Sequence, residues 1–265
     1  MSQGTFVYEN TINTDETDLE ALGSIAGLSP IHKFGFNNDV GSTYEPVCIG
    51  GNYQVPTAAV TLQIESDDAQ DNSAGTGARE VTIQGLAADW SFVQTTVVPD
   101  GLTPVTIDTD FVRVFRIFVS SSGTYATQSA GSHVGEITIT DAATGTDIWA
   151  VISNDGFPFG QGEISAYTVP KGFKALVKNF TVKVSSAKAV DVLFFQRPNA
   201  NDIVAPYSGA MRVIARAEQI DDLYESSTHS PYGPFDEYTD IGFMAKTPTS
   251  SGVVSTEFEI FLYKK

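Results

Sequence analysis

Ala59-Val60-Thr61-Leu62-Gln63-Ile64-Glu65 decides the fold, because apolar and polar residues alternate along it without a break. Successive side chains of a β-strand point to opposite faces, so this period of two predicts a strand with one buried face. Similar runs, rich in Val, Ile, Thr and Phe, occupy residues 81–83, 137–140, 175–184, 190–196, 210–217 and 256–263. Gly, Asp, Asn, Ser and Pro separate the runs, as is typical of turns between strands. The sequence therefore predicts an all-β protein.

The segment 111–119 (FVRVFRIFV) is more apolar than the other runs, which predicts a strand buried on most of both faces. About a dozen strands at this spacing need facing sheets to cover their apolar sides. We therefore expect a β-sandwich or jelly-roll architecture.

Composition suggests where the chain divides. Residues 154–162 hold three Gly and one Pro, as a connector does. We expect one sandwich over residues 31–155 and a second over 163–265, with a single large sandwich as the alternative. Residues 1–30 carry five acidic residues and no Lys or Arg, which predicts an extended acidic N-terminal arm.

Charge excludes some classes of partner. The 265 residues include 32 Asp and Glu against 15 Lys and Arg, a formal net charge of −17. A phosphate-binding surface needs clustered basic residues, so we expect no direct contact with nucleic acid. No apolar run approaches the roughly 18 residues of a membrane span, and residues 1–10 lack the pattern of a signal peptide. We expect a protein made in the cytoplasm, without a membrane partner.

Catalytic motifs are missing from the sequence. His32, His133 and His229 are scattered, and the single Cys48 lies between apolar neighbours, where a buried structural role is favoured over a nucleophile. We expect no enzyme, no catalytic residue and no cofactor. The alternative, an acid-dependent hydrolase, would need two carboxylates from distant strands, and spacing along the chain identifies no such pair.

One acidic segment has the ligand type that calcium prefers. Asp67, Asp68 and Asp71 lie within residues 65–72, beside a Gly-rich turn. Calcium takes several oxygen ligands, but the EF-hand spacing and its terminal Glu are missing here. These residues are thus candidate calcium ligands, and the alternative is an exposed acidic hairpin loop.

One aromatic segment has the composition of a recognition loop. Tyr224, Tyr232, Phe235 and Tyr238 alternate with Pro and polar residues over 224–238. Such rings could stack on sugars or fit a partner's groove. The alternative is a long connection whose rings anchor it to the sandwich.

Four phrases carry a resemblance to a known group of proteins. They are IHKFGFN at 31–37, GTGAREVTIQGL at 75–86, FVRVFR at 111–116 and AYTVPKGF at 166–173. In this order, and together with the acidic N-terminus, they resemble virion structural proteins of tailed phages, especially marine ones. The resemblance extends from about residue 31 to the C-terminus, and its phrases describe strands and turns of a scaffold.

The resemblance implies a bacteriophage capsid decoration (cement) protein that binds the major capsid protein and stabilises the head. It also implies a homo-oligomer, preferably a homotrimer, on the capsid surface of the virion. The alternative is a tail-associated or receptor-binding protein that recognises a host surface glycan through the aromatic segment.

Overall fold

The computed structural model describes residues 27–123, 131–155, 159–185, 188–202, 210–226, 231–248 and 251–265. Seventeen strands make up its regular structure, and the single helical element among these residues is the short 3-10 turn η1. The strands are β1 Leu28–Val40, β2 Glu45–Pro46, β3 Val60–Ser66, β4 Ala78–Leu86, β5 Phe92–Val97, β6 Val105–Phe111, β7 Arg113–Ser122, β8 Ile137–Asp141, β9 Ile148–Ile152, β10 Ala166–Thr168, β11 Phe173–Val184, β12 Val190–Arg197, β13 Arg212–Ile220, β14 Leu223–Glu225, β15 Tyr232–Phe235, β16 Asp240–Lys246 and β17 Gly252–Lys264, and η1 is Ile49–Gly51. The prediction of an all-β chain is confirmed.

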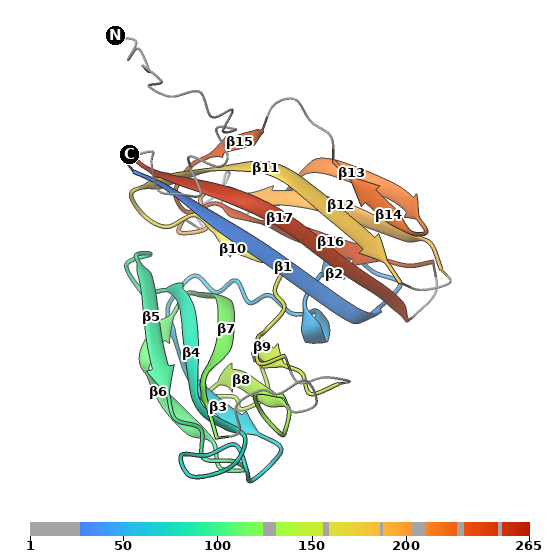
Figure 1. The fold of residues 1–265 in the computed structure, drawn as a ribbon. Helices are drawn as coiled ribbons and strands as arrows, with labels where there is room; N and C mark the ends of the chain where they lie inside the picture. Colours follow the sequence, from blue (N-terminus) through green and yellow to red (C-terminus); the bar gives the residue numbers. More distant parts are fainter. Residues whose placement is uncertain are drawn as a thin grey trace, which may run out of the picture.

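One pair of facing sheets contains both ends of the described chain, and we call it the terminal sandwich. Its first sheet has the order β1-β17-β11-β14, with β15 also on β11, and its second has the order β10-β16-β12-β13, with β2 on β16. Antiparallel pairing along β1, β17 and β11 gives this sandwich its longest strands (Figure 1). Its core includes a cluster of rings, in which Phe194 stacks on Phe243 at 4.8 Å and Phe243 meets Phe258 at 5.2 Å between ring centroids.

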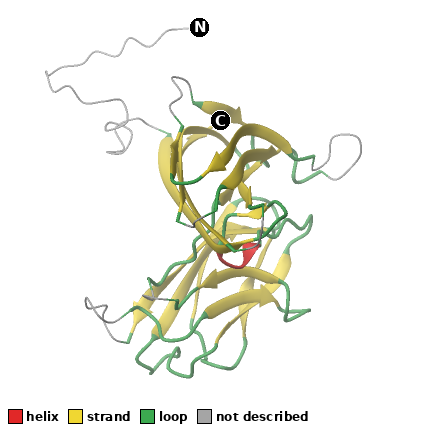
Figure 2. Ribbon diagram, turned by 90° about the vertical axis from the view of Figure 1, so that its right-hand side faces the viewer, coloured by secondary structure: helices red, strands yellow, loops and turns green. Residues whose placement is uncertain are grey.

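A second pair of sheets is built from β3 to β9, and we call it the inserted sandwich. Its sheets have the orders β6-β3-β8-β9 and β5-β4-β7. A separate core of buried side chains fills the space between them, among them Ile64, Ile83, Ile117 and Ile139. This core exists because the alternating runs turn one apolar face inward from each sheet. Figure 2 shows the two sandwiches one above the other, with η1 where they meet.

The expected ranges differ from the observed pairing at the N-terminal side. Strand β1 joins the C-terminal strand β17, with Ile31 opposite Ile260 and Phe34 opposite Glu257, so residues 31–40 belong to the terminal sandwich and not to the first of two consecutive ones. An alternating pattern shows which face of a strand is buried, but it does not encode which strands pair. The inserted sandwich therefore interrupts the terminal one. A jelly roll and a division into two domains stay predictions.

The last residues of the expected N-terminal arm belong to a strand. Residues 28–30 already pair with β17 as the start of β1, which the apolar Leu28 favours and Pro30 tolerates because β1 is an edge strand. Residues 1–26, the rest of that arm, lie outside the described residues.

The run 111–119 contains two strands, where we expected one. Strand β6 ends at Phe111 in one sheet of the inserted sandwich, and β7 begins at Arg113 in the other. Between them the Val112 amide donates to the Leu86 carbonyl at 2.9 Å. A strand that changes sheets at a corner is buried on both sides there, and this explains the dense apolar pattern. No helix of the described residues is long and apolar enough to cross a membrane.

Candidate functional site

The predicted calcium ligands have separate structural roles. Asp71 is fully buried, and its carboxylate accepts hydrogen bonds from the Ser66 hydroxyl (2.6 Å) and from the amides of Ala78 (2.7 Å), Val134 (3.0 Å) and Gly135 (2.8 Å). These four donors tie the acidic loop to β4 and to the segment before β8. The Asp71 carboxylate thus serves as a hydrogen-bond hub of the loop.

The other two acids cap neighbouring backbone. Asp67 accepts from the Glu136 amide at 2.7 Å, and Asp68 accepts from the Gln70 amide at 2.7 Å. Within the described part of the chain, no group of three or more His, Cys, Asp or Glu side chains is arranged to hold a metal ion. The structure thus does not bring the three predicted ligands together as a calcium site.

The predicted aromatic candidates are divided between core and surface. Phe235 is buried, and Tyr232 packs on Phe180 and Phe194 with centroids 5.8 and 5.4 Å away. Tyr238 meets the Trp90 ring edge-on at 5.8 Å. These three rings anchor their connection to the terminal sandwich, as the alternative interpretation expected, whereas residues 227–230 lie outside the described chain. Phe235 is too buried to stack on a ligand.

Tyr224 remains at the surface, at one edge of the terminal sandwich. It lies on β14, the last strand of one sheet, and β13 is the last strand of the facing sheet. Of the nine large apolar side chains exposed by the described residues, four lie on or beside these two strands: Met211, Val213, Leu223 and Tyr224. We call these four side chains the apolar edge. Met211 and Val213 lie at the start of β13, and Leu223 and Tyr224 follow its end, so exposed apolar side chains occur at both ends of this edge. Single exposed apolar residues are ordinary, but several of them on edge strands are a recognised feature of protein contacts.

A buried ion pair joins the two sandwiches. The guanidinium of Arg113 on β7 donates from Nε and Nη2 to the two carboxylate oxygens of Asp240 on β16, at 2.8 and 2.9 Å. The side chains are 1% and 0% exposed. Arg113 also donates to the Pro56 carbonyl at 2.8 Å and lies over the Trp90 ring at 5.0 Å, while the Thr168 hydroxyl donates to Asp240 at 2.5 Å. The charges are thus paired and bonded in the manner that burial requires.

Strand β1 makes a second set of contacts across the same junction. The buried Nζ of Lys33 donates to the Phe115 carbonyl of β7, and Arg116 donates to the His32 carbonyl at 2.6 Å. The Phe115 ring packs on Tyr167 of β10 with centroids 4.5 Å apart. Three of the four phrases that carry the phage resemblance, 31–37, 111–116 and 166–173, therefore meet at this junction.

Burial, with the nearby charge of Arg116, places the pKa of Lys33 well below its ordinary value of 10.5. Between the two pKa values the unfolded chain binds the extra proton, so the contribution of Lys33 to stability rises with pH. We expect the difference in unfolding free energy between Lys33→Met and the unchanged protein to vary with pH by up to about 1.4 kcal/mol per pH unit in this window.

Urea denaturation at several pH values below 9 measures this slope. Above pH 9 the buried Cys48 thiol, whose pKa is raised to about 12, makes the free energy of unfolding fall as the pH rises, because the unfolded chain loses that proton first. Lys264→Met, at an exposed position on β17, is the matched control, because it removes the same kind of side chain away from the junction. If the free energy of unfolding changed with pH in the same way for Lys33→Met and for the unchanged protein, Lys33 would have an ordinary pKa.

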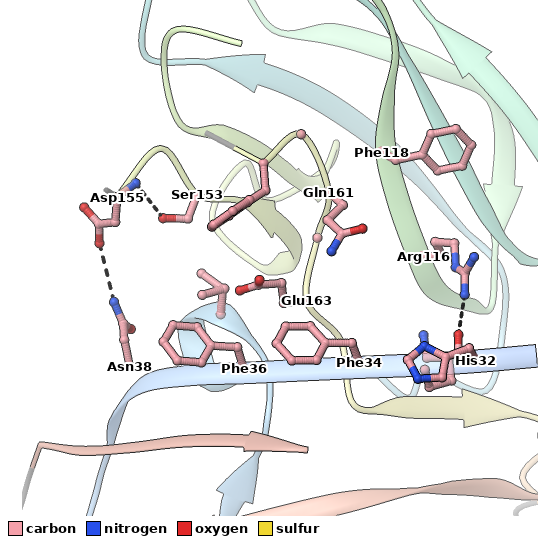
Figure 3. A pocket seen from close by; sticks show the side chains of 15 residues that line it. His32, Phe34, Phe36, Asn38, Arg116, Phe118, Ser153, Asp155, Gln161 and Glu163 are labelled. Carbon is pink, nitrogen blue, oxygen red and sulfur yellow. Dashed lines mark hydrogen bonds between the residues drawn. The ribbon is translucent and has the colours of Figure 1, made fainter. Parts of the chain in front are cut away.

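A groove lies beside the junction, between β1, β7 and the connector that leads to β10 (Figure 3). Its volume is about 920 Å³. The groove lining has aromatic rings and polar groups together: Phe34, Phe36, Phe118 and Phe159, with His32, Asn38, Arg116, Asp155, Gln161 and Glu163. Clefts with aromatic walls and a few convergent polar groups are the usual form of a ligand site.

The polar groups of the groove are spread along its length. Asn38 donates to Asp155 at 3.4 Å at one end, and Arg116 lies at the other, bonded to the His32 carbonyl (Figure 3). Glu163 lies between them, near Phe36, and partial burial raises the pKa of its carboxyl group. An acid that is partly desolvated in this way favours a neighbour that can donate a hydrogen bond.

No pattern in the sequence points to this groove. The one signal available was Phe34-Gly35-Phe36, in which two rings at positions i and i+2 of a strand point to the same side. The connector residues that face them come from more than 110 positions later, at 153, 155 and 159–163, and no local pattern predicts that contact.

Comparisons with known proteins show little similarity. No protein-family model matches the chain, and no curated protein does. Among solved structures, the VP2 subviral particle of infectious bursal disease virus aligns with 91% of this chain and 77% of that chain, at 10% identity and a TM-score of 0.20. A structure of the Gt strain of the same virus aligns with 89% and 75%, at 8% identity and a TM-score of 0.17. Identities and TM-scores this low do not show a shared fold.

Proposed function

We propose that the protein is a virion structural protein of a tailed phage, a capsid decoration protein that binds the major capsid protein and stabilises the head. The observation that carries this proposal is the apolar edge of the terminal sandwich. Val213 and Leu223 are each 54% exposed there, on the last strands of two facing sheets. The phage-like phrases support the same assignment.

The apolar edge suits a contact between proteins. An edge strand presents unpaired backbone N–H and C=O groups that a neighbouring chain can extend. Apolar side chains beside that edge add burial, which is the main favourable term in association. Arg212 and Glu218 on β13 supply polar groups at the border of the contact. A copy of the same chain and the major capsid protein are the two partners that we propose.

The junction supports a structural role through its rigidity. A decoration protein that spans subunits must hold its own parts in a fixed geometry. Here the paired Arg113 and Asp240, together with buried Lys33, fix the inserted sandwich on the terminal one. We propose the capsid surface as the location and a homotrimer as the assembly, because decoration proteins often occupy threefold positions.

Mixing the purified protein with bare phage capsids and imaging them by electron microscopy tests the proposal. We expect regular density at lattice symmetry points, and a solution mass of three chains. Val213→Lys should weaken capsid binding or oligomerisation about tenfold or more, because a charge replaces an exposed apolar side chain that the proposed contact would bury.

Phe92→Lys is the matched control, since Phe92 is also exposed but lies on the inserted sandwich at β5. It should bind as the unchanged protein does. Capsids that stay bare, or full occupancy by Val213→Lys, would contradict the proposal. A stable oligomer that ignores capsids would favour a tail-associated role.

A further inference from the structure

The groove between β1 and the connector offers a ligand two neighbouring aromatic rings. Phe34 and Phe36 lie side by side along β1, on the side that faces Glu163 (Figure 3). Residues two apart on a strand are separated by about 6.6 Å, so two consecutive rings of a chain molecule can contact both. The Phe159 side chain, 65% exposed, lines the same groove. We propose that this groove binds a neutral oligosaccharide.

Hydrogen-bonding groups around the rings fit the hydroxyls of a sugar. Gln161 and Asn38 can both donate and accept, and Glu163 and Asp155 accept when ionised. A sugar ring has apolar faces for stacking and a rim of hydroxyls, so it uses rings and polar groups together. Partial burial raises the pKa of Glu163 because it disfavours the charged carboxylate, and a hydroxyl that donates to this carboxylate offsets that cost.

The charge of the site favours a neutral ligand over an anionic one. Glu163 and Asp155 both line the groove, and the whole chain carries a formal net charge of −17. Arg116 and Lys33 line it too, but both donate to backbone carbonyls, those of His32 and Phe115, and Lys33 is buried. An acidic polysaccharide would therefore meet repulsion beside Asp155 and Glu163 and from the net charge of the chain.

A peptide strand fits the groove less well than a sugar. Strand addition needs free backbone groups along β1, the edge strand that borders the groove. Two of those groups are already used, because the Phe36 amide donates to the Glu163 carbonyl at 3.5 Å and the His32 carbonyl accepts from Arg116. The connector thus occupies the edge that a peptide would need.

The other face of β1 holds the groove in shape. Lys33 and Asn37 point to that face and are buried, and Asn37 donates to Glu45 at 2.9 Å. Gly35 lies against Ser165, where a Cβ would come within 2.6 Å of the Ser165 backbone. With its backbone held in this way, β1 presents the two rings at little ordering cost to a ligand.

Isothermal titration calorimetry of the full chain tests the proposal with cellohexaose, laminarihexaose, chitohexaose and mannohexaose, and with a galacturonate hexamer as the anionic probe. We expect at least one neutral hexasaccharide to bind with one site per chain and the anionic one not to bind. Phe36→Ala should weaken that binding about tenfold or more, as the loss of one stacking ring does.

Gln161→Ala tests the site without disturbing the core, because Gln161 is exposed, and it should weaken binding about threefold to tenfold. Phe92→Ala removes an exposed ring outside the groove and should bind normally. The inference is wrong if no neutral hexasaccharide binds at millimolar concentration, if the galacturonate hexamer binds as tightly, or if Phe36→Ala and Gln161→Ala both retain full affinity. Loss of capsid binding, by contrast, would leave this result unchanged, since the groove and the apolar edge are separate surfaces.

Discussion

Asp240→Ala is expected to lower the free energy of unfolding by about 3–5 kcal/mol, because it leaves the buried Arg113 guanidinium without its counter-charge. The two side chains share two hydrogen bonds of 2.8 and 2.9 Å and are almost completely excluded from solvent. Thr168 also loses its acceptor. Urea denaturation monitored by tryptophan fluorescence measures the effect, and Trp90, on whose ring Arg113 lies, is a local probe of the junction.

Two variants separate burial from the mere presence of a charge pair. Asp236→Ala breaks the ion pair with Lys174 at 3.0 Å, but Asp236 is 68% exposed, so we expect a loss of only about 0–1 kcal/mol. The double variant Arg113→Met with Asp240→Leu should be less destabilised than Asp240→Ala, since the fully buried guanidinium is removed together with its partner and only Arg197, 20% exposed and 3.9 Å from Asp240, loses a carboxylate. If Asp240→Ala cost no more than Asp236→Ala, the sandwiches would not depend on this pair.

The pattern of alternation was sufficient to locate several of the strands. The run 59–65 becomes β3 and the run 137–140 becomes β8, because a strand with one buried face needs only its own residues to show the period. Pairing could not be predicted in the same way. β1 and β17 are joined across more than 200 positions, and their register depends on a core that forms only when both are present.

The candidate site residues could be found from their own segments, but the residues that they contact lie far away in the sequence. Tyr224 was identified from its segment and is 37% exposed, whereas Phe235 and Tyr232 of the same segment are turned into the core. Composition alone does not distinguish a ring that anchors a loop from one that meets a partner. Arg113 was visible only as a charge inside an apolar run, and its partner Asp240 lies 127 positions later.

Asp71→Ala should also be strongly destabilising, by about 3 kcal/mol or more, because three backbone amides and one hydroxyl lose their acceptor at once. These are the amides of Ala78, Val134 and Gly135 and the hydroxyl of Ser66, and Asp71 itself is fully buried. Thermal and urea unfolding of the full chain measure the loss. Asp68→Ala, which removes the acceptor of a single backbone amide, is the control and should cost about 1 kcal/mol.

The same pair of variants tests calcium binding at the acidic loop. The carboxylate of Asp71 already accepts hydrogen bonds from the donors around it. We therefore expect the unchanged protein to have the same melting temperature in millimolar calcium chloride as in millimolar magnesium chloride. An increase with calcium alone that disappears in Asp68→Ala would establish a calcium site on this loop instead. In that case the hydrogen-bond hub would have to open on binding, and the cost of Asp71→Ala would rise further when calcium is present.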